Sequence, residues 1–264
     1  MKKFFLQLVI IVALFFSTWF VLNQLDWMTV FEVEKKTDQT EEKLGELFWE
    51  MIESTEQVNT DPFIANTIDS IIDKICKENE IDKEYLKVHV LNKDEVNAFA
   101  MPNGHLAIYS GLILASENQE ELTGVICHEI AHIQLNHIME KLVREVGIAI
   151  LISMTTGNNS NTVHEIANLL TSSAFDRSSE KEADIKAVDY LVKANINPEA
   201  FANFLYKLSD NEDESMKYLS WISTHPDSKE RAKYIIEYSG NSTEDYETII
   251  SEKTWNKLKD QLVE

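Results

Sequence analysis

The segment TGVICHEIAHIQLNH, residues 123–137, decides the fold, because it places ionisable side chains inside an apolar helical pattern. An α-helix turns about once every 3.6 residues, so His128 and His132 lie on one face, one turn apart. Their imidazoles can converge on a point roughly 2 Å from each ring nitrogen, which is a zinc–nitrogen distance. Glu129 lies about 100° around the helix, away from that point but within reach of a water molecule beside it. The spacing therefore predicts a zinc site.

The pattern H-E-x-x-H on a helix is typical of zinc metalloproteases, in which the glutamate serves as the general base. The alternative interpretation is a core helix that carries polar residues by chance. Burying three ionisable side chains costs free energy unless they are paired or bound to a metal, which favours the zinc interpretation. The flanking residues form the apolar face expected of a buried helix: Leu122, Val125, Ile126, Ile130 and Ile133.

Two histidines do not complete a catalytic zinc site, which needs a third protein ligand and an open position for water. A metzincin would place a third histidine six residues after His132, but Ile138 occupies that position. His137, five residues after His132, lies off the ligand face. The third ligand must therefore come from elsewhere in the chain.

A later helical segment, DRSSEKEADIKAVDYL (residues 176–191), offers three candidate carboxylates. Glu180 and Asp184 are four residues apart and share a face of this predicted helix, whereas Glu182 points away from them. A glutamate from this helix is thus a candidate third ligand.

The remaining pattern predicts a mainly helical protein with a small sheet. LKVHVLN (residues 86–92) alternates as a strand does, and Pro102-Asn103-Gly104 is a turn signal between two strand-like pieces. Ile64, Ile68, Ile71, Ile72 and Ile75 recur at helical spacing. We expect an α+β fold in which the zinc helix and the glutamate-bearing helix surround a small antiparallel sheet.

Four segments, in this order, resemble the gluzincin peptidases of the HtpX, BepA, Oma and CAAX prenyl protease type. They are NAFAMPNGHLAIYSGL (97–112), HEIAH (128–132), DRSSEKEAD (176–184) and STHPDSKER (223–231), and the resemblance covers about residues 60–237. It implies one Zn²⁺ per chain. The ligands would be His128, His132 and Glu180, and Asp184 would orient a ligand histidine.

The resemblance also implies a peptide-hydrolysing mechanism, with Glu129 as the general base. An extended protein or peptide substrate would pair with the strand Asn97, Ala98, Phe99 and Ala100 through backbone hydrogen bonds. His225 would stabilise the oxyanion or occupy the open zinc position at rest, and the alternative is a loop histidine that caps nearby backbone. Arg177 and Arg231 either brace the Asp184 region or are surface residues.

The amino terminus predicts a membrane anchor. Phe4 to Leu22 is an uncharged, mostly apolar run of 19 residues, preceded by Lys2 and Lys3. As a helix it would be roughly 28 Å long, which matches a bilayer core. The positive-inside rule places the amino terminus in the cytoplasm and the catalytic domain outside it, in the periplasm or at the cell surface. A cleaved signal peptide is the alternative. HtpX-type and prenyl-protease-type members have several spans, whereas this chain has one candidate.

The chain has 264 residues and a formal charge of −21, which argues against a nucleic-acid partner. We expect an anchor in residues 1–25, an acidic linker and helix in 26–60, a zinc metallopeptidase domain in 61–240 and a helical tail in 241–264. Cys76 and Cys127 are expected as buried apolar residues, with a disulfide as the alternative.

These features together predict a membrane-anchored zinc endopeptidase that acts on protein substrates, in envelope protein quality control. The alternative function is a zinc-stabilised chaperone-like or binding protein with little turnover. An intact Glu129 favours the enzyme, because a protein that only holds its clients has no need of a general base.

Overall fold

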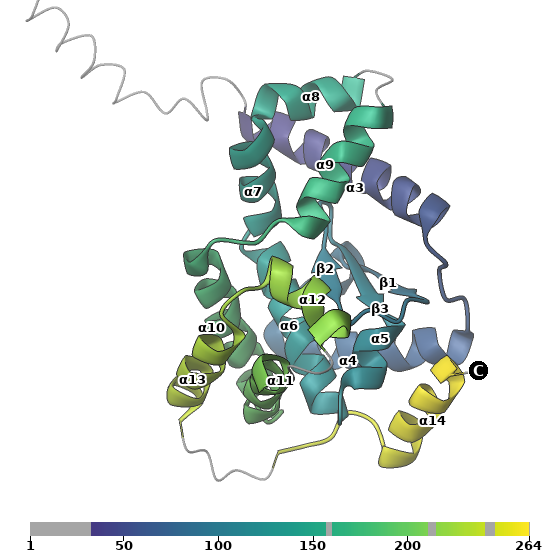
Figure 1. The fold of residues 1–264 in the computed structure, drawn as a ribbon, viewed down its shortest axis with the longest axis vertical. Helices are drawn as coiled ribbons and strands as arrows, with labels where there is room; N and C mark the ends of the chain where they lie inside the picture. Colours follow the sequence, from purple (N-terminus) through teal and green to yellow (C-terminus); the bar gives the residue numbers. More distant parts are fainter. Residues whose placement is uncertain (1–32, 157–159, 211–214, 241–245, 264) are drawn as a thin grey trace, which may run out of the picture. The chain divides into compact units, whose positions relative to one another are not determined.

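The computed structural model describes residues 33–156, 160–210, 215–240 and 246–263 (Figure 1). The chain divides into two compact units, residues 1–41 and 42–264, and the architecture below is that of the second. The candidate anchor, Phe4 to Leu22, lies outside the described residues. Within the described ranges, no helix combines the length and the apolar character that crossing a bilayer requires.

The predicted fold class is confirmed, because helices surround a single three-stranded sheet in the described part of the chain. The helices are α3 (Val33–Thr55), α4 (Pro62–Asn79), α5 (Ser110–Ala115), α6 (Gln119–Gln134), α7 (His137–Val146), α8 (Ile148–Thr156), α9 (Ser160–Ser172), α10 (Arg177–Lys193), α11 (Glu199–Asp210), α12 (Ser215–Thr224), α13 (Ser228–Ser239) and α14 (Glu252–Val263), with the 3-10 helix η1 (Lys83–Tyr85).

The sheet is mixed rather than antiparallel, which corrects the predicted topology. Its order is β1 (Lys87–Leu91), β3 (His105–Tyr109), β2 (Ala98–Ala100). β2 and β3 form the predicted antiparallel hairpin, but β1 pairs with β3 in parallel. At the hairpin turn, Asn103 and Gly104 have φ of 60° and 71°, a backbone that favours these residue types. A Cβ on Gly104 would lie 2.1 Å from the carbonyl oxygen of Tyr85, so only glycine fits there.

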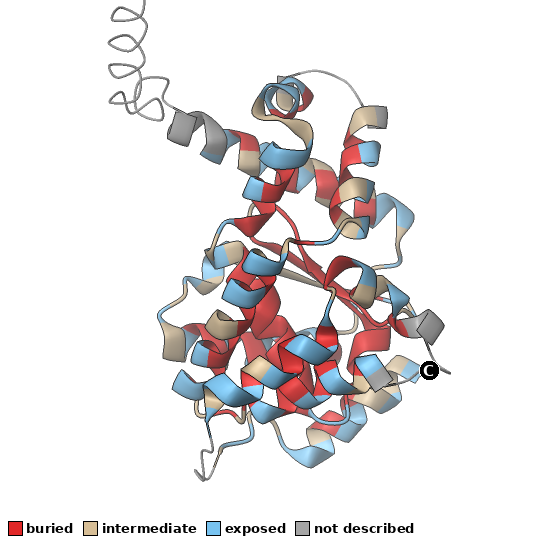
Figure 2. Cartoon of the chain, turned by 60° about the vertical axis from the view of Figure 1, so that its left-hand side comes forward, coloured by how far each residue is buried: buried red, intermediate tan, exposed pale blue. Residues whose placement is uncertain are grey.

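Strand β3 is buried on both faces and separates two apolar clusters. Leu106 and Ile108 point into a cluster built mainly from α4, α6, α10 and α11. Ala107 and Tyr109 alternate with them and point into a second cluster, which includes residues of α3, α7, α8 and α9. Figure 2 shows these buried residues running through the middle of the second unit.

Helix α6 lies at the centre of the first cluster and packs against α10, α11 and β2. Its contact with α11 is close at Gly124, where an added Cβ would lie 2.4 Å from the Cβ of Phe201. This packing places the last turns of α6 beside the first turns of α10 and beside strand β2, which is where the sequence motifs meet.

Candidate metal centre

Helix α6 carries both motif histidines in its buried carboxyl-terminal half. The helix begins after Asn118, whose side chain accepts a hydrogen bond from the backbone N–H of Glu121 at 2.9 Å. His128 and His132 follow on one face, both fully buried, and their Nε2 atoms lie 3.0 Å apart. Two imidazole nitrogens directed at one point in an apolar core form half of a zinc site.

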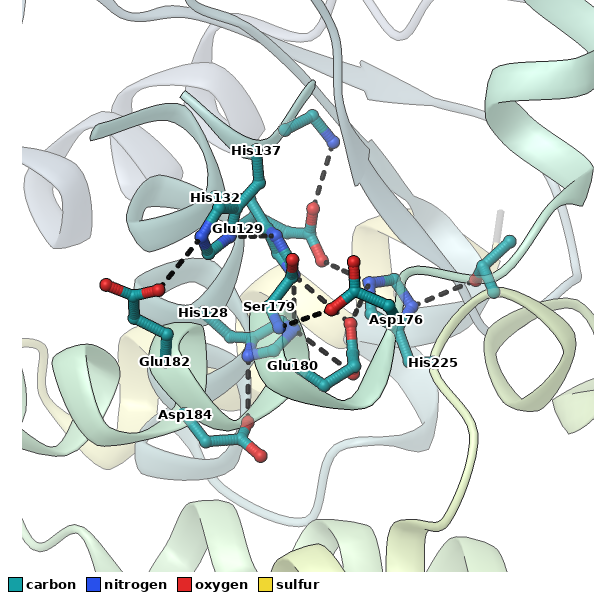
Figure 3. A network of polar contacts seen from close by, with 12 residues as sticks. His128, Glu129, His132, His137, Asp176, Ser179, Glu180, Glu182, Asp184 and His225 are labelled. Atoms are coloured by element: carbon teal, nitrogen blue, oxygen red, sulfur yellow. Dashed lines mark hydrogen bonds and ion pairs between the residues drawn. The ribbon is translucent and has the colours of Figure 1, made fainter. Parts of the chain in front are cut away.

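Helix α10 supplies a carboxylate to the same point, as Figure 3 shows. The Asp176 side chain caps this helix by accepting a hydrogen bond from the N–H of Ser179 at 2.8 Å, so Glu180 lies in its first turn. Oε1 of Glu180 lies 3.3 Å from Nε2 of His132, and Oε2 lies 3.8 Å from Nε2 of His128. The three predicted ligands are therefore close together.

The residues present fit a zinc ion. In the part of the chain that the structure describes, one group of side chains could hold a metal, and its four ligand atoms lie within 4.8 Å of one another. It contains His128, His132, Glu180 and His225. Oε1 of Glu180 and Nε2 of His225 are buried without a hydrogen-bond partner, which costs free energy that a cation at the centre would remove, whereas Oε2 of Glu180 pairs with the Arg231 guanidinium. Imidazole and carboxylate donors are those that zinc prefers.

The carboxylate of Asp184 contacts His128 on the side of the ring that faces away from the cluster. Its Oδ1 lies 2.9 Å from Nδ1 of His128, the nitrogen that faces away from the cluster. The Arg231 guanidinium donates to Oδ2 and Oδ1 at 2.8 and 2.7 Å, and the Tyr234 hydroxyl donates to Oδ2. Burial alone would raise the pKa of Asp184, but Arg231 and His128 outweigh it and hold the pKa well below its usual range. Asp184 is thus an ionised carboxylate beside a candidate ligand.

His137 lies behind the second histidine, which the helical-wheel argument missed. Its Nδ1 is 3.0 Å from Nδ1 of His132, and its Nε2 is 3.6 Å from Oε2 of Glu182. A continuous helix would direct His137 elsewhere, but α6 ends at Gln134 and the chain turns at Asn136, whose φ is 60°. The position of His137 therefore depends on the start of α7, which the motif spacing does not determine.

The carboxylate of Glu129 points toward the cluster and toward strand β2. Its Oε2 accepts a hydrogen bond from the backbone N–H of Ala100 at 2.9 Å, and its Oε1 lies 3.3 Å from Nε2 of His225. Burial raises the pKa of Glu129 to about 7, although the neighbouring His128 acts in the opposite direction. The carboxylate of Glu129, a group that can accept a proton, thus lies between the candidate metal ligands and the edge strand β2.

The predicted substrate strand, Asn97 to Ala100, borders the site through its outer edge. Asn97 accepts from the N–H of Tyr109, and Met101 donates to the carbonyl of His105, so these two residues face β3. The backbone groups of the intervening Ala98 and Ala100 then face outward, away from β3. The side chain of Asn97 donates to the hydroxyl of Ser220 on α12 at 2.8 Å, and all four strand residues are buried.

His225 follows α12 and is the fourth member of the cluster. Its ring stacks on Trp221, with centroids 4.1 Å apart, and its Nδ1 lies 2.9 Å from the hydroxyl of Thr224. Burial lowers the pKa of His225 to about 3, so the imidazole is neutral. Its Nε2 lies 3.3 Å from Oε1 of Glu129 and 4.0 Å from Oε1 of Glu180, which places this nitrogen among the candidate ligand atoms.

The two arginines that the sequence left open have different surroundings. Arg231 is buried and braces Asp184, whereas the Arg177 side chain is 80% exposed and pairs with Asp227 at 2.8 Å. Both arginines, together with Glu180 and Tyr234, line a cavity of about 160 Å³. The sequence marked neither Tyr234 nor Ser220, because a lone tyrosine or serine on a predicted helix carries no spacing signal.

Cys76 and Cys127 are both buried free thiols, as the first interpretation of the sequence expected. Burial raises the pKa of the Cys76 thiol to about 11 and that of the Cys127 thiol well above its usual range. Neither sulfur is among the candidate metal ligands.

Comparison with known proteins agrees with the geometry. A beta-barrel assembly-enhancing protease of Yersinia pestis is 23% identical over 223 residues, which cover 77% of this chain and 46% of the relative. The metalloprotease LoiP of Escherichia coli (strain K12) is 32% identical over 165 residues, covering 60% and 64% of the two chains. The mitochondrial metalloendopeptidase OMA1 of Schizosaccharomyces pombe is 26% identical over 155 residues, covering 58% and 46%.

The chain spans about half the length of the beta-barrel assembly-enhancing proteases that it matches. The family described as Peptidase family M48 matches residues 63–239, a range that begins in α4 and ends with α13. Because this match covers more than half of the chain and contains every candidate ligand, the chain belongs to peptidase family M48.

Proposed function

We propose that this protein is a zinc-dependent endopeptidase that hydrolyses peptide bonds of protein substrates. One observation carries the proposal: His128, His132 and Glu180 converge at a point beside the carboxylate of Glu129. This arrangement supplies three ligands and a general base, the minimum set for metal-assisted hydrolysis.

In this proposal His128, His132 and Glu180 hold one zinc ion. When bound, zinc supplies Lewis acidity, which polarises a carbonyl and lowers the pKa of water. The two helices fix the ligands before the ion arrives, because α6 and α10 pack directly against each other. Asp184 holds Nδ1 of His128 and thereby leaves Nε2 free for the ion.

Glu129 is the proposed general base and acid. Its Oε1 accepts a proton from the attacking water and later returns it to the leaving amide nitrogen. Its position between the candidate ligands and β2 suits this exchange, because a general base must lie within hydrogen-bond reach of the proton that it takes. The hydrogen bond from Ala100 to Oε2 keeps Oε1 directed at the cluster.

We place the substrate as an extended strand along the outer edge of β2. The backbone groups of Ala98 and the carbonyl of Ala100 face that edge, while the N–H of Ala100 donates to Glu129, and backbone pairing gives affinity with little dependence on substrate side chains. The segment from Ser220 to His225 now lies against this edge, since Ser220 accepts from Asn97 and His225 contacts Glu129. Substrate entry therefore requires this segment to move.

His225 has two proposed roles, stabilising the oxyanion or filling the open zinc position at rest. Its burial with His128, His132 and Glu180 favours an enzyme with low resting turnover. The same observation supports a second candidate function, a zinc-stabilised protein that holds clients without cutting them.

We also propose that Phe4 to Leu22 anchors the domain in a membrane with the catalytic part outside the cytoplasm, where it acts in envelope protein quality control. The apolar run and its preceding lysines support the anchor, and the names of the beta-barrel assembly-enhancing relatives support the envelope role. A protease added to spheroplasts should digest the domain. Full protection would contradict the orientation, and a mature amino terminus near residue 25 would contradict the anchor.

The decisive experiment incubates the full-length protein with unfolded casein, with and without a zinc chelator, beside a Glu129→Gln variant. We expect cleavage by the wild type and none by the variant or in the chelator. Zinc content should be near one per chain in both proteins. Zinc binding without cleavage under any condition would favour the client-holding protein.

A further inference from the structure

His132 has a dedicated partner on its far side, and that partner is a third histidine. His137 is the first residue of α7 and is 4% exposed. Its Nδ1 lies 3.0 Å from Nδ1 of His132, while the Nε2 of His132 faces the cluster at 3.0 Å from Nε2 of His128. Figure 3 shows the three rings in sequence, with Glu182 beyond His137.

The protonation of the ring nitrogens determines which histidine donates and which accepts the hydrogen bond between His132 and His137. If Nε2 of His132 gives its lone pair to a metal, the neutral ring carries its proton on Nδ1. That N–H needs an acceptor, and Nδ1 of His137 is the atom in place. His137 must then carry its own proton on Nε2, the nitrogen 3.6 Å from the carboxylate of Glu182.

We propose that His137 is a positioning residue that accepts the Nδ1 proton of His132 and so selects the tautomer of His132 that binds zinc. Glu182 stabilises the matching tautomer of His137. The proposal rests on the proposed function, because it assigns His132 as a ligand. His128 and His132 would then differ in their supports, since His128 is held by an ionised carboxylate and His132 by a neutral imidazole.

An aromatic side chain covers the face of the His132 ring. The ring of Phe175 stacks on that of His132, with centroids 4.0 Å apart and an interplanar angle of 26°. The backbone N–H of Phe175 donates to the carbonyl of Thr224 at 3.1 Å, which fixes the loop that carries this ring. Stacking sets the plane of His132 but not which nitrogen is protonated, so the tautomer depends on His137.

The test compares four variants of the full chain with the wild type by zinc affinity, measured by competition with a chromophoric chelator. His137→Leu fills the buried space with an apolar side chain and removes the hydrogen-bond acceptor. His137→Asn places an amide oxygen near the position of Nδ1 and restores an acceptor for the His132 proton. Glu182→Gln removes the outer charge, and Glu165→Gln, an exposed glutamate on α9, is its matched control.

We expect His137→Leu to weaken zinc binding by about 10–100-fold, the range seen when such outer partners are lost. The cobalt-substituted form should show an altered visible spectrum, a signature that a general loss of stability does not produce. His137→Asn should recover most of the affinity and the wild-type spectrum. Glu182→Gln should weaken zinc less than about 10-fold, because this carboxylate is exposed, and Glu165→Gln should have no effect.

Wild-type zinc affinity and an unchanged spectrum in a folded His137→Leu variant would overturn the inference. Equal losses in His137→Leu and His137→Asn would also overturn it, because the acceptor would then be irrelevant. If the wild-type protein binds no zinc, the proposed function itself fails, and the two failures are distinguishable.

Discussion

At the scale of single residues, Asp184 combines two roles that the sequence suggested only in part. The family resemblance implied that Asp184 orients a ligand histidine, and Oδ1 of Asp184 lies 2.9 Å from Nδ1 of His128. The buried Arg231 guanidinium, which donates two hydrogen bonds to the same carboxylate, could not be assigned from spacing. It lies 47 residues away, and only the packing of α13 on α10 brings it there.

Asp184→Asn should therefore weaken both zinc binding and the fold. Loss of the partner of His128 should lower zinc affinity or turnover by about 10–100-fold. Removing one member of a buried ion pair should also lower the free energy of unfolding by about 3–5 kcal/mol, because Arg231 loses its counter-charge. Urea unfolding and chelator competition measure the two effects separately. Unchanged stability would show that Glu180, which Arg231 also contacts, compensates the guanidinium.

Lys141 is a buried cation that should make stability rise at alkaline pH. Its Nζ donates to the carbonyls of Leu170 and Ser173 and lies 4.2 Å from the ring centre of Phe175. Burial lowers the pKa of Lys141 to about 8, against about 10.4 in an unfolded chain. Between these values the unfolded chain holds more protons, so the free energy of unfolding should increase with pH, by at most about 1.4 kcal/mol per unit.

The measurement is a series of urea unfolding curves at pH 7–10.5 for the wild type and Lys141→Met. The difference between the two proteins removes the contribution of other groups that titrate in this range. The free energy of unfolding of the wild type should increase relative to that of Lys141→Met as the pH rises. A constant difference would mean that Lys141 titrates normally in the folded protein.

At the scale of elements, local signals were predictable from the sequence and long-range pairings were not. The turn residues Asn103 and Gly104 specify the β2–β3 hairpin, because positive φ at both positions favours them. The parallel pairing of β1 with β3 has no such signal, because its register depends on packing between distant segments. The same reason explains why the contact between His137 and Glu182 was not predicted. Each was judged on its own predicted helix, whereas they meet between α7 and α10.

The carboxyl-terminal helix α14 had no evident role in the sequence, but it packs on α4 and α5, and the residues just before it bind the amino-terminal end of α6. Gln119, the first residue of α6, donates to the carbonyl of Ile250 and accepts from the N–H groups of Ile249 and Ile250. Trp255 is buried and donates to the carbonyl of Glu117 at 3.3 Å. The tail thus belongs to the same core as the helix that carries the metal-binding motif.

Gln119→Ala should lower the free energy of unfolding by about 1–3 kcal/mol, because buried backbone groups lose their partner. Trp255→Ala should cost about 3–5 kcal/mol through the cavity it leaves. Thermal and urea unfolding measure both, with zinc affinity as a second reading that should change little. A tail that unfolds independently would instead give an early transition of its own and leave the main one unaltered.

At the scale of the whole molecule, the candidate metal centre is built by residues from several separate elements of the second unit. The proposed ligands come from α6 and α10, the proposed base contacts β2, and His225 follows α12. Arg231 forms ion pairs with the buried carboxylates of Glu180 and Asp184, and a third buried carboxylate, that of Glu129, lies beside His225. Without a divalent cation, this cluster holds more negative than positive charge in a medium where charge separation is costly.

Zinc should therefore stabilise the folded domain as a unit. At a free zinc concentration 100 times the dissociation constant, binding should raise the free energy of unfolding by about 2.7 kcal/mol. For a domain of this size, each kcal/mol corresponds to roughly 2–4 °C, so the melting temperature should rise by roughly 5–11 °C. Scanning calorimetry with added zinc or a chelator measures the shift. Glu129→Gln should retain it, because Glu129 is not a proposed ligand, whereas His132→Ala and Glu180→Gln should lose it. A shift that survives in His132→Ala would place the zinc at another site, and equal melting temperatures in zinc and chelator would mean that the cluster binds no zinc.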